Sequence, residues 1–400
     1  MSGAWHLGPT APVLRPAAEP APETTPLRRP RREPPPAPPP VRWHWVILFC
    51  WAVLLQVVLY SNGGYSWHFF AEGAALLRDQ HPPGMTAPGG LHLYANYPQL
   101  QIGPLALLVA IALEPFASDG GWMVDAWLMT LCGLAVLYLI EHLVRVSRPH
   151  GSRAQVVTLL AGGLSFLFAW ELLAVHFGHL DDVLALLLLT CAAVAVRYRA
   201  PVLTGVFLGL AVDAKPWALA CAALLLVAPW RDWWRGAAAV AIVVALGWLP
   251  FVLADPHSLA VTSFVIPNVD ASSLRALGVT TPNTPSWDRE AQIALGCGLG
   301  VLAVLRRRWP AVLALGIGAR IVLDPSVYTY YTAGFALGVL IWDLVGFRRP
   351  MPVLSALCFA GLIAPVFLLH NGHLLGELRL WTLLVAGAVL LVIPGRKEPI

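Results

Sequence analysis

The chain has 400 residues, of which 58% are hydrophobic and only 12% are charged, and its net charge is +4. Soluble domains carry about a quarter charged residues, so this composition excludes a protein that covers itself with polar surface in water. The sequence contains no Walker loop, Rossmann glycine fingerprint or HExxH motif, which disfavours an ATP-driven pump or a zinc protease. Membrane lipid is the expected surrounding partner, and nucleic acid is not expected.

The N-terminal segment differs from the rest of the chain. Residues 1–42 are rich in proline and contain the basic run Arg28, Arg29, Arg31 and Arg32. Such a composition buries no core, so we predict a disordered tail. By the positive-inside rule its arginines place it in the cytoplasm.

Apolar runs follow one another from Trp43 to Pro394. About 20 apolar residues cross a bilayer core, and lipid leaves backbone groups unsatisfied unless the segment is helical. We therefore predict an all-α polytopic transmembrane bundle of about twelve crossings over residues 43–394, with a short C-terminus at 395–400. The predicted crossings are 43–61, 121–144, 154–174, 181–199, 201–215, 216–230, 236–254, 290–305, 309–324, 326–346, 351–369 and 378–394.

The basic residues orient this bundle. With the N-terminus inside, 20 of the 26 lysines and arginines fall in the tail, in the alternate loops or at the C-terminus. This bias predicts a multi-pass plasma-membrane protein with both termini in the cytoplasm. The sequence says nothing of its oligomeric state.

One apolar stretch, 99–117, does not fit the alternation, because a crossing there would place Arg145–Arg153 outside. It is short and contains Gly103 and two prolines. We predict an interfacial or re-entrant helix on the outer side. The long outer loops are then 62–120 and 255–289.

The first candidate cluster is His176, His179, Asp181 and Asp182, at the outer mouth between two predicted crossings. Aspartates at a helix start cap free N–H groups, and their negative charge interacts favourably with the helix dipole. This is the purely structural interpretation. However, ionisable groups at membrane depth are expensive and mark substrate paths. Two carboxylates beside two histidines would supply a general base or hold a divalent cation.

The second cluster is Asp213, Lys215 and Pro216, where two short helices meet. Residues 201–214 span only ~21 Å as a helix, less than the ~30 Å bilayer core, so the hairpin tip lies below the outer boundary. Lys215 and the free N–H groups of the next helix form a candidate phosphate site. Alternatively, Asp213 and Lys215 neutralise each other, or the lysine reaches the interface.

Two further groups complete the candidates. Arg320 lies one helical turn before Asp324, with Tyr328 close behind, and suits either a second phosphate contact or an internal ion pair. The first outer loop combines amides, aromatic rings and ionisable groups that suit either sugar hydroxyls or an ordinary interface belt. Its candidate substrate-binding residues are His68, Glu72, Tyr97 and Gln99.

The stretch FGHLDDVLALLLL, beginning at Phe177, and the stretch LTGVFLGLAVDAKPWALACAALLL resemble actinobacterial polyprenyl-phosphate-dependent mannosyltransferases of the GT-C superfamily (DUF2029 or GT87-like). The motif YPQL at Tyr97 and the segment LDPSVYTYY fit the same pattern. This resemblance implies a GT-C-like fold and a transferase that moves mannose or another sugar from a polyprenyl-phosphate donor to an envelope lipid or glycan acceptor.

The resemblance also implies roles for the candidates. Lys215, with Arg320, would hold the phosphate, and Asp181 or Asp182 would remove a proton from the acceptor hydroxyl. The acidic residue that these families place just after the first helix is missing here, where the chain reads Gly64-Tyr65-Ser66-Trp67-His68. This departure leaves two alternatives open, a non-enzymatic lipid or glycolipid transporter and a scaffold for an envelope complex.

Overall fold

The computed structural model describes residues 43–116, 122–148, 151–263 and 265–395, so the predicted tail at 1–42 and residues 396–400 lie outside it. Within these residues all regular secondary structure is helical, apart from one isolated bridge between Pro267 and Asn283. The α-helices begin with α1 (Trp43–Tyr60), α2 (Trp67–Leu77), α3 (Leu93–Asn96), α4 (Pro104–Leu113), α5 (Trp122–Ser147), α6 (Arg153–Glu171), α7 (Leu180–Arg197) and α8 (Pro201–Ala214). They continue with α9 (Trp233–Ala254), α10 (Ser273–Ala276), α11 (Asp288–Leu305), α12 (Val312–Leu323), α13 (Thr329–Ile341), α14 (Val353–Cys358), α15 (Ala364–Leu368) and α16 (Gly372–Val392).

Five helical segments are long and apolar enough to cross a membrane, and several shorter apolar helices accompany them. The five are Trp43–Tyr60, Trp122–Ser147, Arg153–Phe177, Trp230–Ala254 and Gly372–Val392. The predicted class, a polytopic helical membrane protein, is confirmed, whereas the number of crossings and their orientation stay predictions. One predicted crossing, 216–230, forms a 3-10 helix, η4 (Pro216–Val227), in place of an α-helix.

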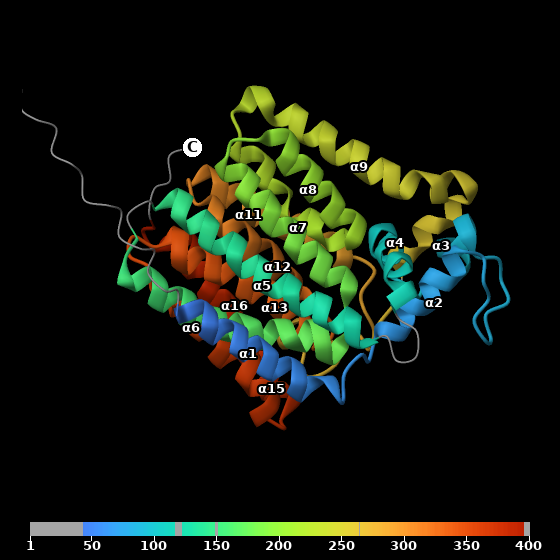
Figure 1. Ribbon diagram of the computed structural model, residues 1–400, viewed down its shortest axis with the longest axis horizontal. Coiled ribbons are helices and arrows are strands. Elements are labelled where there is room, and N and C mark those ends of the chain that lie inside the picture. Colours follow the sequence, from blue (N-terminus) through green and yellow to red (C-terminus); the bar gives the residue numbers. More distant parts are fainter. Residues whose placement is uncertain (1–42, 117–121, 149–150, 264, 396–400) are drawn as a thin grey trace, which may run out of the picture. The chain divides into compact units, whose positions relative to one another are not determined.

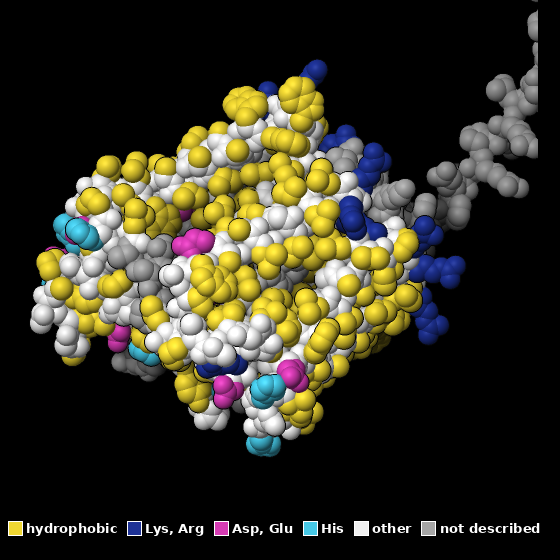
Figure 2. Space-filling model, turned by 180° about the vertical axis from the view of Figure 1, so that it is seen from behind, with side chains coloured by type: hydrophobic (Ala, Val, Ile, Leu, Met, Phe, Trp, Pro, Cys, Tyr) yellow, Lys and Arg dark blue, Asp and Glu magenta, His cyan; other side chains and the backbone are white. Residues whose placement is uncertain are grey.

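The bundle is built from neighbours in sequence. Helix α8 packs between α7 and α9, α11 packs on α12 and η4, and α1 lies against α6. Figure 1 shows α2, α3 and α4 gathered at one end of the bundle beside the end of α9. On the face in Figure 2, Lys and Arg side chains gather mainly at one end of a largely apolar surface.

Helix α4 occupies the stretch that the sequence sets apart from the crossings. Its 10 residues extend about 15 Å, half the thickness of a bilayer core. It packs on α2 and against the C-terminal end of α8, where the Gly103 N–H donates to the Ala214 carbonyl oxygen at 3.2 Å. The first outer loop is thereby fixed to the hairpin tip that carries Lys215.

Gly103 permits this contact because it has no side chain. A Cβ atom there would lie 2.0 Å from the Asp213 carbonyl oxygen and 2.5 Å from that of Ala214. We expect Gly103→Ala to destabilise the protein by about 1–3 kcal/mol, because backbone atoms on both sides must move apart. Thermal unfolding in detergent, followed by intrinsic fluorescence, measures this loss.

The matched control is Gly298→Ala in α11, where an added Cβ meets nothing within 4 Å. This control should melt at the wild-type temperature or slightly higher, because alanine favours a helix over glycine. Equal melting temperatures for the two variants would contradict the packing argument.

Candidate functional site

A cavity of about 500 Å³ lies where the two long outer loops meet the bundle. Its lining comes from the start of α2, the segment before α4, the starts of α7 and α11, the turn after α8 and the turn between α12 and α13. The volume is in the range typical of ligand sites. Segments far apart in the sequence therefore meet around one space large enough for a substrate.

The wall formed by α7 begins at a sharp reversal of the chain. Helix α6 ends in a π-helical turn, η3 (Leu172–Phe177), and Gly178 follows with φ of 71°. Glycine adopts this left-handed conformation readily, and a Cβ atom there would lie 2.9 Å from the Trp122 ring. The reversal places Asp181 and Asp182 in the first turn of α7, where the helix dipole favours negative charge.

These two carboxylates meet the hairpin tip. The Lys215 ammonium forms an ion pair with Asp181 and lies 3.7 Å from Asp182 Oδ2. His179 Nδ1 lies 3.5 Å from Asp181 Oδ1, and the Trp217 indole N–H donates to Asp182 Oδ1 at 2.7 Å. Both aspartates are fully buried or nearly so. Burial of this kind is tolerated because each charge has a close partner.

The same cluster has the composition of a cation site. Ligand atoms of His179, Asp181 and Asp182 all lie within 4.8 Å of one another, and two carboxylates with an imidazole suit a divalent cation. The Lys215 ammonium already supplies a positive charge to both carboxylates. The residues therefore fit a divalent cation only when Lys215 moves away from them.

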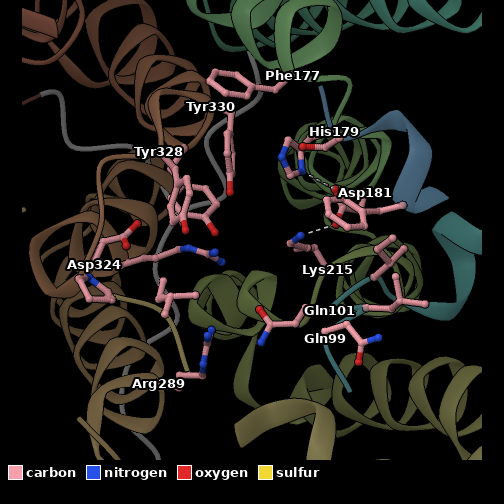
Figure 3. Close-up of a pocket in the computed structure, with 18 of the residues that line it drawn as sticks. Gln99, Gln101, Phe177, His179, Asp181, Lys215, Arg289, Asp324, Tyr328 and Tyr330 are labelled. Carbon is pink, nitrogen blue, oxygen red and sulfur yellow. Dashed lines mark hydrogen bonds and ion pairs between the residues drawn. The ribbon is translucent and has the colours of Figure 1, made fainter. Parts of the chain in front are cut away.

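The facing wall is formed by α12, α13 and the turn between them. The Arg320 guanidinium lies 3.8 Å from the centre of the Tyr331 ring and 5.4 Å from that of Trp217. Such cation–π contacts hold a guanidinium without neutralising its charge. Of the two alternatives for Arg320, the ion pair with Asp324 is not among the ion pairs of the described residues. Figure 3 shows Asp324 and Tyr328 across the cavity from Lys215 and Asp181.

Asp324 lies in the turn after α12 and is 3% exposed. The Ser326 N–H donates to its Oδ1 at 3.0 Å. This contact fixes the position of the buried carboxyl group in the turn.

A second cavity of about 260 Å³ adjoins the first. The two share Lys215, Arg289 and Arg320, so three cationic side chains stand at their boundary. The walls that belong to the second cavity alone are mostly apolar and come from η4, α9 and α11. They are Pro216, Trp217, Ala220, Trp248, Glu290 and Ile293.

The structure brings most of the predicted site residues together. Asp182 lies directly behind the lining, in contact with Trp217, His179 and Lys215. The predicted residues that line the larger cavity are Gln99, His179, Asp181, Lys215, Arg320, Asp324 and Tyr328.

Five other predicted residues do not line either cavity. Asp213 faces α9, where its carboxylate lies against Gly247, and it does not pair with Lys215. The His176 ring packs 4.9 Å from the Tyr65 ring, outside the lining of both cavities, and its role in substrate binding stays a prediction.

The remaining three belong to the first outer loop. The His68 ring lies 3.9 Å from the Phe69 ring, and the Tyr97 hydroxyl donates to the Ala87 carbonyl oxygen at 2.8 Å. Glu72 is half-buried on α2 outside the lining. These three side chains therefore lie outside the lining of both cavities, and their roles in substrate binding stay predictions.

Sequence reasoning missed the contribution of α11. Asp288, Arg289 and Gln292 all line the larger cavity. Asp288 and Gln292 are four residues apart at a helix start, a spacing that places them on one face. Their position at the end of an outer loop was the available signal.

The fold and this cavity define a polytopic helical membrane protein with a charged, aromatic-lined site. The model of glycosyltransferase family 87, a GT-C family of membrane glycosyltransferases, matches residues 102–289 of the chain. The match contains Asp181, Asp182 and Lys215, whereas Arg320 lies beyond it. The comparison with curated proteins found no match.

Proposed function

We propose that this protein is a glycosyltransferase that moves a sugar, mannose or a related hexose or pentose, from a polyprenyl-phosphate donor to an envelope lipid or glycan on the outer face of the plasma membrane. The observation that carries the proposal is the pair of adjoining cavities with Lys215, Arg289 and Arg320 at their boundary. The larger cavity, the cationic boundary and the smaller apolar cavity match the three parts of a lipid-linked sugar in order. These parts are a polar sugar, an anionic phosphate and an apolar chain.

The different parts of the donor lie in different cavities. Its phosphate lies at the shared boundary, where cations in a partly buried site bind anions strongly. The first isoprene units lie in the smaller cavity, against Trp217, Trp248 and Ile293. The sugar lies in the larger cavity among aromatic, amide and carboxylate groups.

The transfer step follows from this placement. The acceptor oxygen attacks the anomeric carbon of the sugar, and the bond from that carbon to the phosphate oxygen breaks, leaving polyprenyl phosphate with the electron pair. Lys215 moves from Asp181 to the phosphate and stabilises the leaving charge. Asp181, released from its ion pair, accepts the proton of the acceptor hydroxyl, with Asp182 as the alternative base. A divalent cation at His179, Asp181 and Asp182 would lower the basicity of these carboxylates.

The site lies on the side predicted to be outside. The arginine-rich ends of the bundle gather away from the outer-loop elements, in keeping with cytoplasmic termini. An outward-facing site suits a donor that enters from the outer leaflet.

The test is sugar transfer in proteoliposomes. Labelled polyprenyl-phosphate mannose and an envelope-lipid acceptor pool are supplied to wild type, to the double variant Asp181→Asn with Asp182→Asn, and to Arg235→Ala. Arg235 is an exposed residue paired with Asp232, and it lines neither cavity. We expect transfer by wild type and Arg235→Ala, and a loss of about 10²-fold or more in the double variant.

Full transfer by the double variant would overturn the base assignment. If wild type binds polyprenyl-linked mannose, glucose, galactose and arabinose yet transfers none of them to this pool, the proposed activity fails. The transporter alternative would then explain the binding.

A further inference from the structure

A second pair of carboxylates lines the larger cavity on the wall that faces Lys215. Asp288 is 1% exposed and Asp324 is 3% exposed. Gln292 Nε2 donates to Asp288 Oδ2 at 2.7 Å, and the Ser326 N–H donates to Asp324 Oδ1. The other oxygen of each carboxylate, Asp288 Oδ1 and Asp324 Oδ2, is buried without a hydrogen-bond partner among the described residues.

These unpartnered oxygens identify the kind of ligand group that belongs beside them. An ionised carboxylate accepts hydrogen bonds and donates none, and leaving a buried acceptor unsatisfied is unfavourable. Asp288 and Asp324 are therefore suited to hydroxyl donors of a ligand in the cavity. A phosphate group would be repelled by them, so it belongs with the cations at the boundary of the two cavities.

Aromatic rings stand next to this wall. The Tyr328 and Tyr330 rings are 5.1 Å apart, and the Tyr330 ring stacks on the His179 ring at 4.0 Å. Tyr328 and Tyr330 both line the cavity, as Figure 3 shows. Flat apolar faces beside hydroxyl-accepting groups match a sugar ring, which has C–H faces and a hydroxylated edge.

We propose that Asp288 and Asp324 form the hydroxyl-binding wall of the donor-sugar subsite and that they restrict the donor to neutral sugars with free hydroxyl groups. This inference rests on the proposed function and specifies its substrate class. A uronic acid would bring a third carboxylate against two others, and like charges in a partly buried site repel strongly. The pair therefore selects against acidic sugars as well as binding neutral ones.

The test measures binding in lipid nanodiscs by wild type, Asp288→Asn, Asp324→Asn and the control Asp270→Asn. Asp270 belongs to the same outer loop, but its side chain is 80% exposed and lies outside both cavities. The probes are polyprenyl phosphate without sugar, polyprenyl-phosphate mannose and polyprenyl-phosphate glucuronic acid. Melting temperatures confirm that each isosteric variant is folded.

We expect Asp288→Asn and Asp324→Asn to weaken binding of the mannose donor by about 10-fold to 100-fold, as for lost hydrogen bonds to a charged group. Binding of sugar-free polyprenyl phosphate should stay within about threefold of wild type, because the phosphate site is untouched. Wild type should discriminate against the glucuronic acid donor by about tenfold or more, and both variants should discriminate less.

Two outcomes would overturn the hydroxyl-binding role of Asp288 and Asp324 while leaving the proposed function intact. One is equal weakening of the sugar-free and mannose probes, which would assign the aspartates to the phosphate site or to the fold. The other is unchanged mannose binding in both variants. Failure of wild type to bind any of the three polyprenyl probes would overturn the proposed function together with the wall.

Discussion

Lys215→Ala is expected to reduce sugar transfer by about 10²-fold to 10³-fold, the range for removing one electrostatic contact to the charge that develops in a reaction. Lys215 lines both cavities at their boundary, where the phosphate is proposed to lie. Its ammonium is paired with Asp181, and its backbone lies in the turn between α8 and η4, so only its side chain has to move when the donor arrives. Initial rates in proteoliposomes measure the loss.

The same substitution should also destabilise the protein, and this effect must be separated from catalysis. Removing the lysine leaves Asp181 buried without its ion-pair partner, and breaking a buried pair in this way costs about 3–5 kcal/mol. The double variant Lys215→Met with Asp181→Leu replaces both charges by apolar groups of similar size. We expect it to recover much of the melting temperature while transfer stays lost.

Recovery of transfer in that double variant would show that neither the Lys215 charge nor the Asp181 carboxylate is needed for the reaction. Lys215→Arg gives a second check, because it keeps the charge but changes its shape and reach. We expect this variant to fold and to retain part of the activity, with a raised KM for the donor.

The positions of the helices follow closely from apolar runs in the sequence. The predicted crossing 43–61 corresponds to α1, 121–144 to α5 and 236–254 to α9, each displaced by at most a few residues. Prolines and glycines account for the interruptions, as at Gly103 and Pro104 where α4 begins. These local signals work well because lipid requires every crossing segment to satisfy its own backbone groups.

The site is less predictable, because its contacts join distant segments. The sequence indicated that Asp181 and Lys215 are functional candidates, but the 34-residue separation between them hid their ion pair. Proximity in sequence favoured a pair between Lys215 and Asp213, yet α8 turns Asp213 toward α9. Side-chain direction at a helix end depends on tertiary packing, which a single sequence does not reveal.

The residues of α11 that line the cavity were hard to predict for a different reason. Asp288 lies at the end of a loop whose composition resembles an ordinary membrane interface, so its place just before an apolar run separates it only weakly from exposed Asp270. The structure distinguishes the two residues by burial, since Asp270 is 80% exposed and Asp288 is 1% exposed. The backbone contact from the Val269 N–H to the Pro325 carbonyl oxygen, at 2.9 Å, ties this loop to the turn that carries Asp324.

Arg320 offers the second large effect, and Arg320→Lys is its informative variant. The guanidinium is 8% exposed and stacks on Tyr331, so its position depends on a planar group as well as on charge. A lysine ammonium keeps the charge but loses the stacked geometry and the paired N–H donors. We expect Arg320→Lys to lower kcat/KM for the donor by about 10-fold to 100-fold, and Arg320→Ala by about 10²-fold to 10³-fold.

The order of transfer activity among the Arg320 variants distinguishes a phosphate-binding role of Arg320 from a packing role. Arg320→Met supplies the control, because it fills a similar volume without charge. If packing alone matters, Arg320→Met should match or exceed Arg320→Lys in activity. If the guanidinium holds the phosphate, transfer should fall from wild type to Arg320→Lys and further to Arg320→Met, and binding of sugar-free polyprenyl phosphate should follow the same order. This second ordering is expected, because the cationic boundary between the cavities has only a few charges with which to hold an anion at membrane depth.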